Sequence, residues 1–168
     1  MIEIYDDIVP PSMLRILEKA LILEQAWYFS WDEREVKRQD VLGKYPRLTL
    51  GTARNRQYFK PGDNMLLNLL GKKFNTSNIK RVFCNCFRKG DVAQWHTDPA
   101  GTSYMFYLNT RWKRHWGAPT AFEGRKEYPK PGRLVRFSAN IKHKGTAPSI
   151  FMPAYIPGRL SMVFHEGL

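Results

Sequence analysis

His96 and Asp98 combine an imidazole and a carboxylate at a spacing that could hold a metal ion. They lie in a run over 92–98 that we expect to be extended, and residues i and i+2 of a strand point to the same face. A third candidate ligand, His143, follows 45 residues after Asp98, which leaves room for several strands to return. Two histidines and one carboxylate on one face of a metal leave the opposite face open. This arrangement favours Fe(II) that activates O₂ with a second, bidentate ligand, rather than a zinc site.

Arg159 lies beyond the three candidate ligands and could recognise a carboxylate. Its planar guanidinium offers the fork that binds a carboxylate through two parallel hydrogen bonds. Ser161, two residues further on, shares the same face of the predicted last strand. The remaining histidines are weaker alternatives as ligands, because His115 lies in a basic aromatic turn and no cation follows His165 to serve as an anchor.

The elements that position these residues differ between the two parts of the chain. Apolar residues recur at spacings of three and four after Pro10-Pro11-Ser12, which predicts an amphipathic helix that ends before Trp27. A second helix is predicted from Asp63 to Gly71. The charged and aromatic segment 30–60 between them is predicted to form short strands and loops, with a lid as one candidate role.

From residue 79 onward, short β-branched and aromatic runs separated by turn residues are typical of a β-sandwich or barrel. In the first run both alternating faces are mostly apolar, which indicates a strand buried on both sides. Helices followed by a sheet give an α+β fold class. The predicted strands lie at 79–88, 92–98, 103–109, 118–123, 133–138 and 159–165.

The composition indicates a single folded domain with an uneven charge. The chain has 168 residues, of which 43% are hydrophobic and 25% charged, so a disordered or fibrous protein is excluded. The formal charge is +12, and all of the excess falls in residues 71–168, with 17 basic and 5 acidic side chains against 10 of each in residues 1–70. This excess favours an anionic partner, either a nucleic acid or an acidic surface.

The ends and the cysteines of the chain favour a cytoplasmic protein. The N-terminal stretch is acidic where a secretory signal would be basic, and no apolar run reaches the roughly 18 residues that a membrane span needs. We therefore expect neither a signal peptide nor a membrane-bound form. Cys84 and Cys86 are two residues apart in a predicted strand, a poor geometry for a mutual disulfide, and are interpreted as small core residues of a reduced protein.

An ordered series of motifs spans residues 83–164. It comprises Phe87-x-x-Gly90 before His96-x-Asp98, then Tyr107-Leu108-Asn109, Gly117-Ala118-Pro119-Thr120-Ala121-Phe122, Pro131-Gly132-Arg133-Leu134-Val135-Arg136-Phe137 before His143, Pro148, and Gly158-Arg159. The series resembles the core of the prolyl 4-hydroxylase-like 2-oxoglutarate/Fe(II) dioxygenases. The resemblance implies a double-stranded β-helix, or jelly-roll, core with the N-terminal helices packed on one sheet. In this single dioxygenase domain, residues 1–78 would form the helical support and lid segment, and residues 79–168 the core with the metal site.

The same resemblance implies roles for individual residues. His96, Asp98 and His143 would hold Fe(II), and Arg159 would pair with the far carboxylate of 2-oxoglutarate, with Ser161 beside it. The reaction would be a hydroxylation that consumes O₂ and releases succinate and CO₂, with ascorbate as a further candidate cofactor. Because the carboxylate ligand Asp98 is present, hydroxylation is favoured over halogenation.

The sequence departs from the family pattern near the co-substrate. Phe87 and Phe106 stand where relatives often have tyrosines, and neither can donate a hydrogen bond. Tyr104, on the same strand face as Phe106, is the predicted replacement. Arg159 follows His143 by 16 residues, against about ten in relatives, and three prolines in the intervening segment indicate an extended loop. Two lysines are the alternative anchors: Lys142 and Lys144.

The substrate is predicted only by class. A peptide or protein, most plausibly modified at proline, agrees with the resemblance. Arg111, Trp112 and Trp116 belong to a basic aromatic cluster that could contact such a substrate near the barrel mouth. Two alternatives remain: a nucleic-acid hydroxylase or demethylase of the same chemistry, and a non-catalytic jelly-roll module that binds through its basic face. The intact ligand set disfavours the second alternative.

Overall fold

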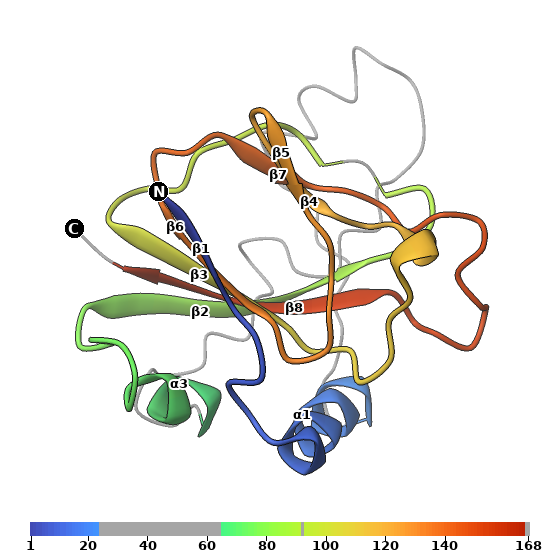
Figure 1. Ribbon diagram of the computed structural model, residues 1–168, viewed down its shortest axis with the longest axis horizontal. Helices are drawn as coiled ribbons and strands as arrows, with labels where there is room; N and C mark the ends of the chain where they lie inside the picture. Colours follow the sequence, from blue (N-terminus) through green and yellow to red (C-terminus); the bar gives the residue numbers. More distant parts are fainter. Residues whose placement is uncertain (24–64, 92, 167–168) are drawn as a thin grey trace.

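The computed structural model describes residues 1–23, 65–91 and 93–166, and its elements follow the order in Figure 1. The predicted segment 30–60 lies outside these residues. The helices are α1 (Pro11–Leu23), α3 (Met65–Leu70) and the 3₁₀ turn η2 (Arg114–Trp116). The strands are β1 (Ile2–Tyr5), β2 (Ile79–Phe87), β3 (Thr102–Tyr107), β4 (Thr120–Phe122), β5 (Arg125–Glu127), β6 (Leu134–Ser138), β7 (His143–Gly145) and β8 (Arg159–Glu166).

Two antiparallel sheets form the body of the molecule. The large sheet has the strand order β1-β6-β3-β8-β2, and the small sheet has the order β5-β4-β7. Figure 1 shows the small sheet on one side of the large sheet and the helices α1 and α3 on the other. Because β2, β3, β6 and β8 are far apart in the sequence yet adjacent in the sheet, the architecture is a β-sandwich of the jelly-roll type.

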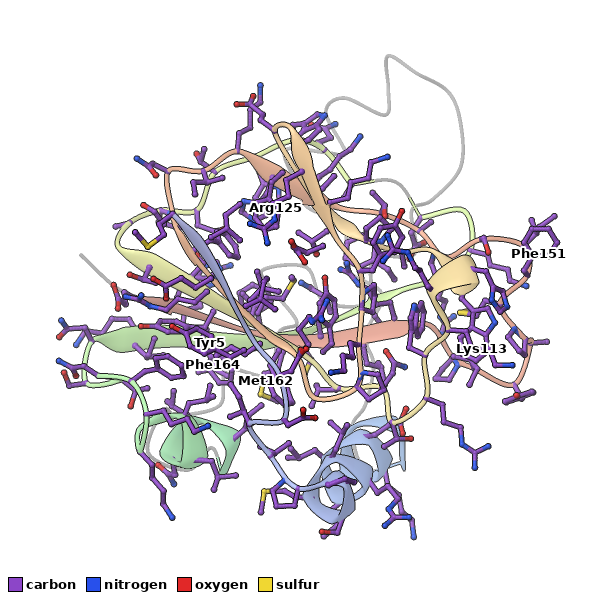
Figure 2. All side chains as sticks on the ribbon, in the orientation of Figure 1. Tyr5, Lys113, Arg125, Phe151, Met162 and Phe164 are labelled. Carbon is purple, nitrogen blue, oxygen red and sulfur yellow. The ribbon has the colours of Figure 1, made fainter. Side chains whose placement is uncertain are left out.

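Both faces of the large sheet carry apolar residues. The sequence predicts this for the strand that begins at residue 79, which is β2. Toward the helices, Tyr104, Phe106 and Phe164 share a buried cluster with residues of α1 and α3, and Figure 2 shows Met162 and Phe164 on this side. Toward the small sheet, Met105 and Tyr107 join a second cluster. Side chains alternate between faces along a strand, so consecutive residues of β3 serve different layers. Because of this alternation, the side chains that pack against the helices and those that face the small sheet and the candidate site come from different positions of the same strands.

The structure corrects several predicted elements. The run 92–98 is not a strand: within its described residues only His96 makes a bridge, to His143. Three short strands were not predicted from the sequence: β1, β5 and β7. Each has only three or four residues, too few for a period of two to stand out. The second helix agrees with the prediction at its end, where the Gly71 amide donates to the Leu67 carbonyl at 2.8 Å.

The two cysteines lie in β2 and are free thiols. Cys86 is buried in the helix-side cluster, and Cys84 packs against that cluster. Burial raises the pKa of Cys86 to about 11 and raises the pKa of Cys84 as well. Both thiols therefore stay protonated at neutral pH, which agrees with a packing role. Among the described helices, none combines the length and the apolar character needed to cross a bilayer.

The turn after β1 is held by ion pairs that should be visible in acid unfolding. Arg133 donates to both carboxylate oxygens of Asp6, at 2.8 and 3.0 Å, and Lys130 donates at 3.0 Å. The hydrogen bonds from Arg133 and then Lys130 lower the pKa of Asp6 from 3.8 to about 2. The folded-state pKa is thus below the unfolded value, so this stabilisation is complete above about pH 4 and is lost as the pH falls toward 2.

We expect Asp6→Asn to lower the free energy of unfolding by about 1 kcal/mol at pH 7, a value reduced for the partial exposure of the pair. Urea unfolding at pH 7 and pH 3 measures the effect, which should be smaller at pH 3. Asp7→Asn, at the exposed neighbouring position, is the matched control and should unfold like the parent protein. An equal loss at both pH values would contradict the assignment.

Candidate active site

His96, Asp98 and His143 come together at one end of the space between the sheets. One nitrogen or oxygen atom from each residue lies within 4.8 Å of the others. His96 and His143 are joined by two backbone hydrogen bonds of 2.9 Å, one in each direction, and the Asp98 amide donates to the Ala139 carbonyl at 2.9 Å. Backbone pairing therefore places all three ligands, although the segment that carries two of them is not a regular strand.

Each imidazole is oriented by the backbone carbonyl of the residue two positions before it. His96 Nδ1 lies 3.0 Å from the Gln94 carbonyl oxygen, and His143 Nδ1 lies 2.9 Å from the Ile141 carbonyl oxygen. A carbonyl can only accept, so Nδ1 donates in each case and Nε2 keeps a free lone pair. Burial lowers the pKa of His143, which keeps its imidazole neutral at pH 7 and available to a metal.

The Asp98 carboxylate lies near the Nε2 atoms of both imidazoles. Its Oδ1 atom is 4.0 Å from His96 Nε2, and its Oδ2 atom is 3.7 Å from His143 Nε2. Ser103 donates to Oδ2 at 2.5 Å, and the Nε2 atom of His165 is 3.4 Å from the same oxygen. The three ligand atoms thus form a compact set of two imidazole nitrogens and one carboxylate oxygen, the donor types that suit non-haem Fe(II).

Arg159 lies on the inner face of β8 with 1% of its surface exposed. Its Nη1 atom donates to the Ala118 carbonyl at 3.3 Å and to Thr120 Oγ1 at 3.1 Å, but its Nε atom has no partner in the described part of the chain. No acidic side chain among the described residues forms an ion pair with it. A buried guanidinium without a counter-charge is costly, and burial accordingly lowers its pKa.

An aromatic ring and a second polar group without a partner flank the Arg159 guanidinium. The Phe87 ring lies 4.4 Å from the guanidinium carbon, and the Oγ atom of Ser161 is buried without a partner among the described residues. Gly145 completes this wall, because a Cβ atom there would approach the Phe87 ring to 2.5 Å and Arg159 Nη2 to 3.0 Å. The Nε atom of Arg159 and the hydroxyl of Ser161, both without partners among the described residues, therefore lie in the same inner layer.

β7 connects the two ends of the site. His143 pairs with Phe122, and Gly145 pairs with Thr120, the hydroxyl partner of Arg159. His143 and Gly145 share one face of the strand, about 6.6 Å apart at the usual rise per residue. β7 thus carries both a metal-ligand residue, His143, and the glycine next to the Arg159 guanidinium, Gly145.

Comparison with solved structures shows the same architecture in prolyl hydroxylases. The viral collagen prolyl hydroxylase from Paramecium bursaria Chlorella virus-1, in its 2OG complex, matches with a TM-score of 0.62 and 16% identity, over 97% of this chain and 93% of that chain. A Pseudomonas putida prolyl-4-hydroxylase matches with a TM-score of 0.56 and 18% identity, over 99% and 93%. The chain has the prolyl 4-hydroxylase fold. No protein-family model and no curated protein sequence matches it.

Within this prolyl 4-hydroxylase fold, the structure brings five predicted residues to the inner layer and leaves Tyr104 outside it. His96, Asp98 and His143 meet at one end, while Arg159 and Ser161 lie on the inner face of β8. Tyr104 instead points to the helix side, where it packs near Phe74 and donates to Glu166 at 3.3 Å. It therefore does not face Arg159, and the predicted replacement of the missing tyrosines is not where the sequence placed it.

The tyrosine that does lie beside Arg159 is Tyr107. Its ring centroid is 5.7 Å from the guanidinium carbon, and its hydroxyl is 2.9 Å from Thr120 Oγ1 and donates to the Glu127 carbonyl at 3.1 Å. Tyr107 is part of the Tyr107-Leu108-Asn109 motif, so the sequence did contain a pattern that includes this tyrosine. The face of β3 that looks inward could not be chosen without the position of the second sheet.

The other predicted residues lie elsewhere in the fold. Trp116 is 5% exposed, and Trp112 stacks edge-on against it and donates to the Gly117 carbonyl at 3.3 Å, so both tryptophans hold the η2 turn. Arg111 is exposed. The alternative anchors also point away: Lys142 is 3.8 Å from Glu123, and the Lys144 ammonium lies 5.0 Å from the centre of the Trp95 ring.

Proposed function

We propose that this chain is an Fe(II)- and 2-oxoglutarate-dependent oxygenase. The observation that carries the proposal is the pairing of two features in one layer: a three-residue ligand set, and a buried arginine that forms no ion pair with an acidic side chain in the described part of the chain. A structural metal site would not need the arginine. Burying an arginine that binds no ligand would only lower the stability of the fold. The solved 2OG complex of a protein with the same fold supports this proposal.

The donor set fits Fe(II). His96 and His143 would bind through Nε2, because their Nδ1 atoms are already hydrogen bonded, and Asp98 would supply the carboxylate. Bound Fe(II) would couple the oxidative decarboxylation of 2-oxoglutarate, to succinate and CO₂, to the transfer of one oxygen atom from O₂ into a C–H bond of the substrate. The ligand residues hold the ion by three positions and leave the opposite side for these reactants.

The anchor end fits the distal carboxylate of 2-oxoglutarate. Arg159 would form a charge-assisted pair with it, and the unpaired hydroxyl of Ser161 would donate to the same group. Thr120 bonds both Tyr107 and Arg159, which holds the guanidinium in place before the co-substrate arrives. The apolar ring of Phe87 covers the guanidinium and excludes water from this end, so the pair would form in a low-dielectric environment.

A peptide or protein is the proposed substrate, with proline as the modified residue, and the collagen and prolyl hydroxylases of the same fold support this choice. The excess of basic side chains after residue 70 favours a second candidate, a nucleic acid modified by the same chemistry. Ascorbate, as a cofactor that sustains turnover, and a cytoplasmic location remain further predictions.

The proposal is tested by incubating the purified protein with Fe(II), 2-oxoglutarate and O₂, with and without ascorbate. Separate reactions contain a proline-rich peptide or a single-stranded oligonucleotide, and mass spectrometry measures succinate and the gain of one oxygen atom. We expect succinate in every reaction with O₂, with the larger stimulation by the peptide. Absence of succinate under all these conditions would reject the oxygenase, and stimulation by the oligonucleotide alone would replace the substrate class.

A further inference from the structure

Three polar residues lie side by side on the inner face of the large sheet, beneath the metal-ligand set. His165 of β8 pairs in register with Ser103 of β3 on one side and with Arg81 of β2 on the other. The same face continues with apolar residues, among them Phe83 and Val163. Further along β8 this face also carries Ser161 and Arg159. Buried polar side chains need partners, and the partner of Ser103 and His165 is Asp98.

Ser103 and His165 both lie close to the same oxygen of Asp98. Ser103 Oγ is 2.5 Å from Oδ2, and His165 Nε2 is 3.4 Å from it. The His165 side chain is only 6% exposed, and its ring meets the Phe83 ring edge-on at 5.2 Å between centroids. Packing therefore keeps the imidazole turned toward the carboxylate.

The hydrogen of the His165 imidazole belongs on Nε2. A neutral imidazole carries one N–H group and one lone pair, and Nδ1 is buried without a partner among the described residues. At Nδ1, a buried N–H group without an acceptor would destabilise the fold more than a buried lone pair without a donor. The neighbouring Arg81 cannot accept a hydrogen bond from Nδ1, because a guanidinium has only donors. With the hydrogen on Nε2, His165 points a donor at Asp98.

We propose that Ser103 and His165 are positioning residues that hold Oδ2 of Asp98, so that Oδ1 is the oxygen presented to the metal. This inference rests on the proposed function, because it assigns Asp98 as a metal ligand. Without the two donors, the carboxylate is free to rotate and loses its fixed orientation toward the imidazoles. Partners of this kind typically account for about 10- to 100-fold in metal affinity.

The test is the affinity for Mn(II) and Co(II), measured by calorimetry without 2-oxoglutarate, together with the absorption spectrum of the Co(II) form. His165→Phe keeps an aromatic ring but removes the donor, and we expect its metal affinity to fall by about 10-fold or more. His165→Gln can place an amide N–H near the position of Nε2 and should recover most of the affinity. His165→Asn places its amide near Nδ1 instead and should not recover it.

Ser103→Ala supplies a second measurement through a smaller change and should lower the affinity in the same direction. Thermal unfolding of each metal-free variant shows that it folds, and His115→Phe in the exposed η2 turn is the matched control, with unchanged affinity expected. Wild-type affinity in both His165→Phe and Ser103→Ala would overturn the inference, as would equal recovery by Asn and Gln. In those cases the oxygenase proposal would stand, whereas a wild-type protein that binds no divalent metal would overturn both.

Discussion

Replacing Asp98 with alanine is expected to abolish 2-oxoglutarate turnover and to weaken metal binding by more than about 100-fold, the upper range for the loss of a mere outer-shell partner. The reason is that Asp98 is the only anionic member of the set, and its two oxygens lie 4.0 Å from His96 Nε2 and 3.7 Å from His143 Nε2. The remaining two neutral nitrogens would bind a divalent ion too weakly to retain it. Calorimetry with Mn(II) and succinate release with Fe(II) measure the two effects.

The controls separate loss of the metal from loss of the fold. Asp98→Asn keeps the shape of the side chain and one oxygen that can accept from Ser103, but it replaces the other oxygen with an NH₂ group and removes the charge. It should therefore lose metal affinity while unfolding at a similar temperature. Asp91→Asn changes a carboxylate that accepts a hydrogen bond from the Arg88 amide at 2.7 Å, outside the ligand set, and should leave metal binding intact. Retained turnover in Asp98→Ala would place the metal elsewhere in the chain.

Replacing Arg159 with alanine is expected to raise the 2-oxoglutarate concentration needed for half-maximal turnover by about 100-fold, since loss of one partner of a buried charge pair costs about 3 kcal/mol. Metal affinity measured without 2-oxoglutarate should stay within about threefold of the wild-type value, because Arg159 touches none of the three ligands. Titration of succinate release against 2-oxoglutarate gives the first quantity, and calorimetry gives the second.

Three further variants identify the anchor. Arg159→Lys keeps the charge but not the planar fork, and should fall between wild type and Arg159→Ala. Thr120→Val removes the hydroxyl that bonds both Arg159 and Tyr107, and should raise the requirement more modestly. Lys144→Ala should have no effect, because this ammonium lies over the Trp95 ring. A large effect of Lys144→Ala, with none of Arg159→Ala, would reverse the assignment.

The long strands were predictable because their pattern is local. Alternation of apolar side chains in β2, β3, β6 and β8 places each of them to within a few residues. The strands β5 and β7 have three residues each, and short segments of this kind are defined by the strands they pair with. The run 92–98 shows the converse: its residues have the pattern of a strand, but among those that the structure describes only His96 forms a β-bridge.

The candidate site divides in the same way. Residue type, spacing and motif order predict a site at His96, Asp98, His143 and Arg159, because the donor atoms that bind a metal or a carboxylate belong to the side chain itself. The structure brings the first three together. Tyr104 and Tyr107 differ in the face they present, and consecutive residues of one strand always face opposite ways. Which of the two faces is the inner one depends on where the small sheet packs.

The sequence alone determined which donors this protein has and the order in which the chain carries them. Only the tertiary structure decided which of them meet: Ser103 and His165 reach Asp98 from two strands that are far apart in the chain, and Tyr107 rather than Tyr104 lies beside Arg159. It also revealed that Arg159 is buried and that its Nε atom has no hydrogen-bond partner among the described residues. Burial and pairing are properties of non-local packing, and neither follows from the types of residue that happen to be neighbours along the chain.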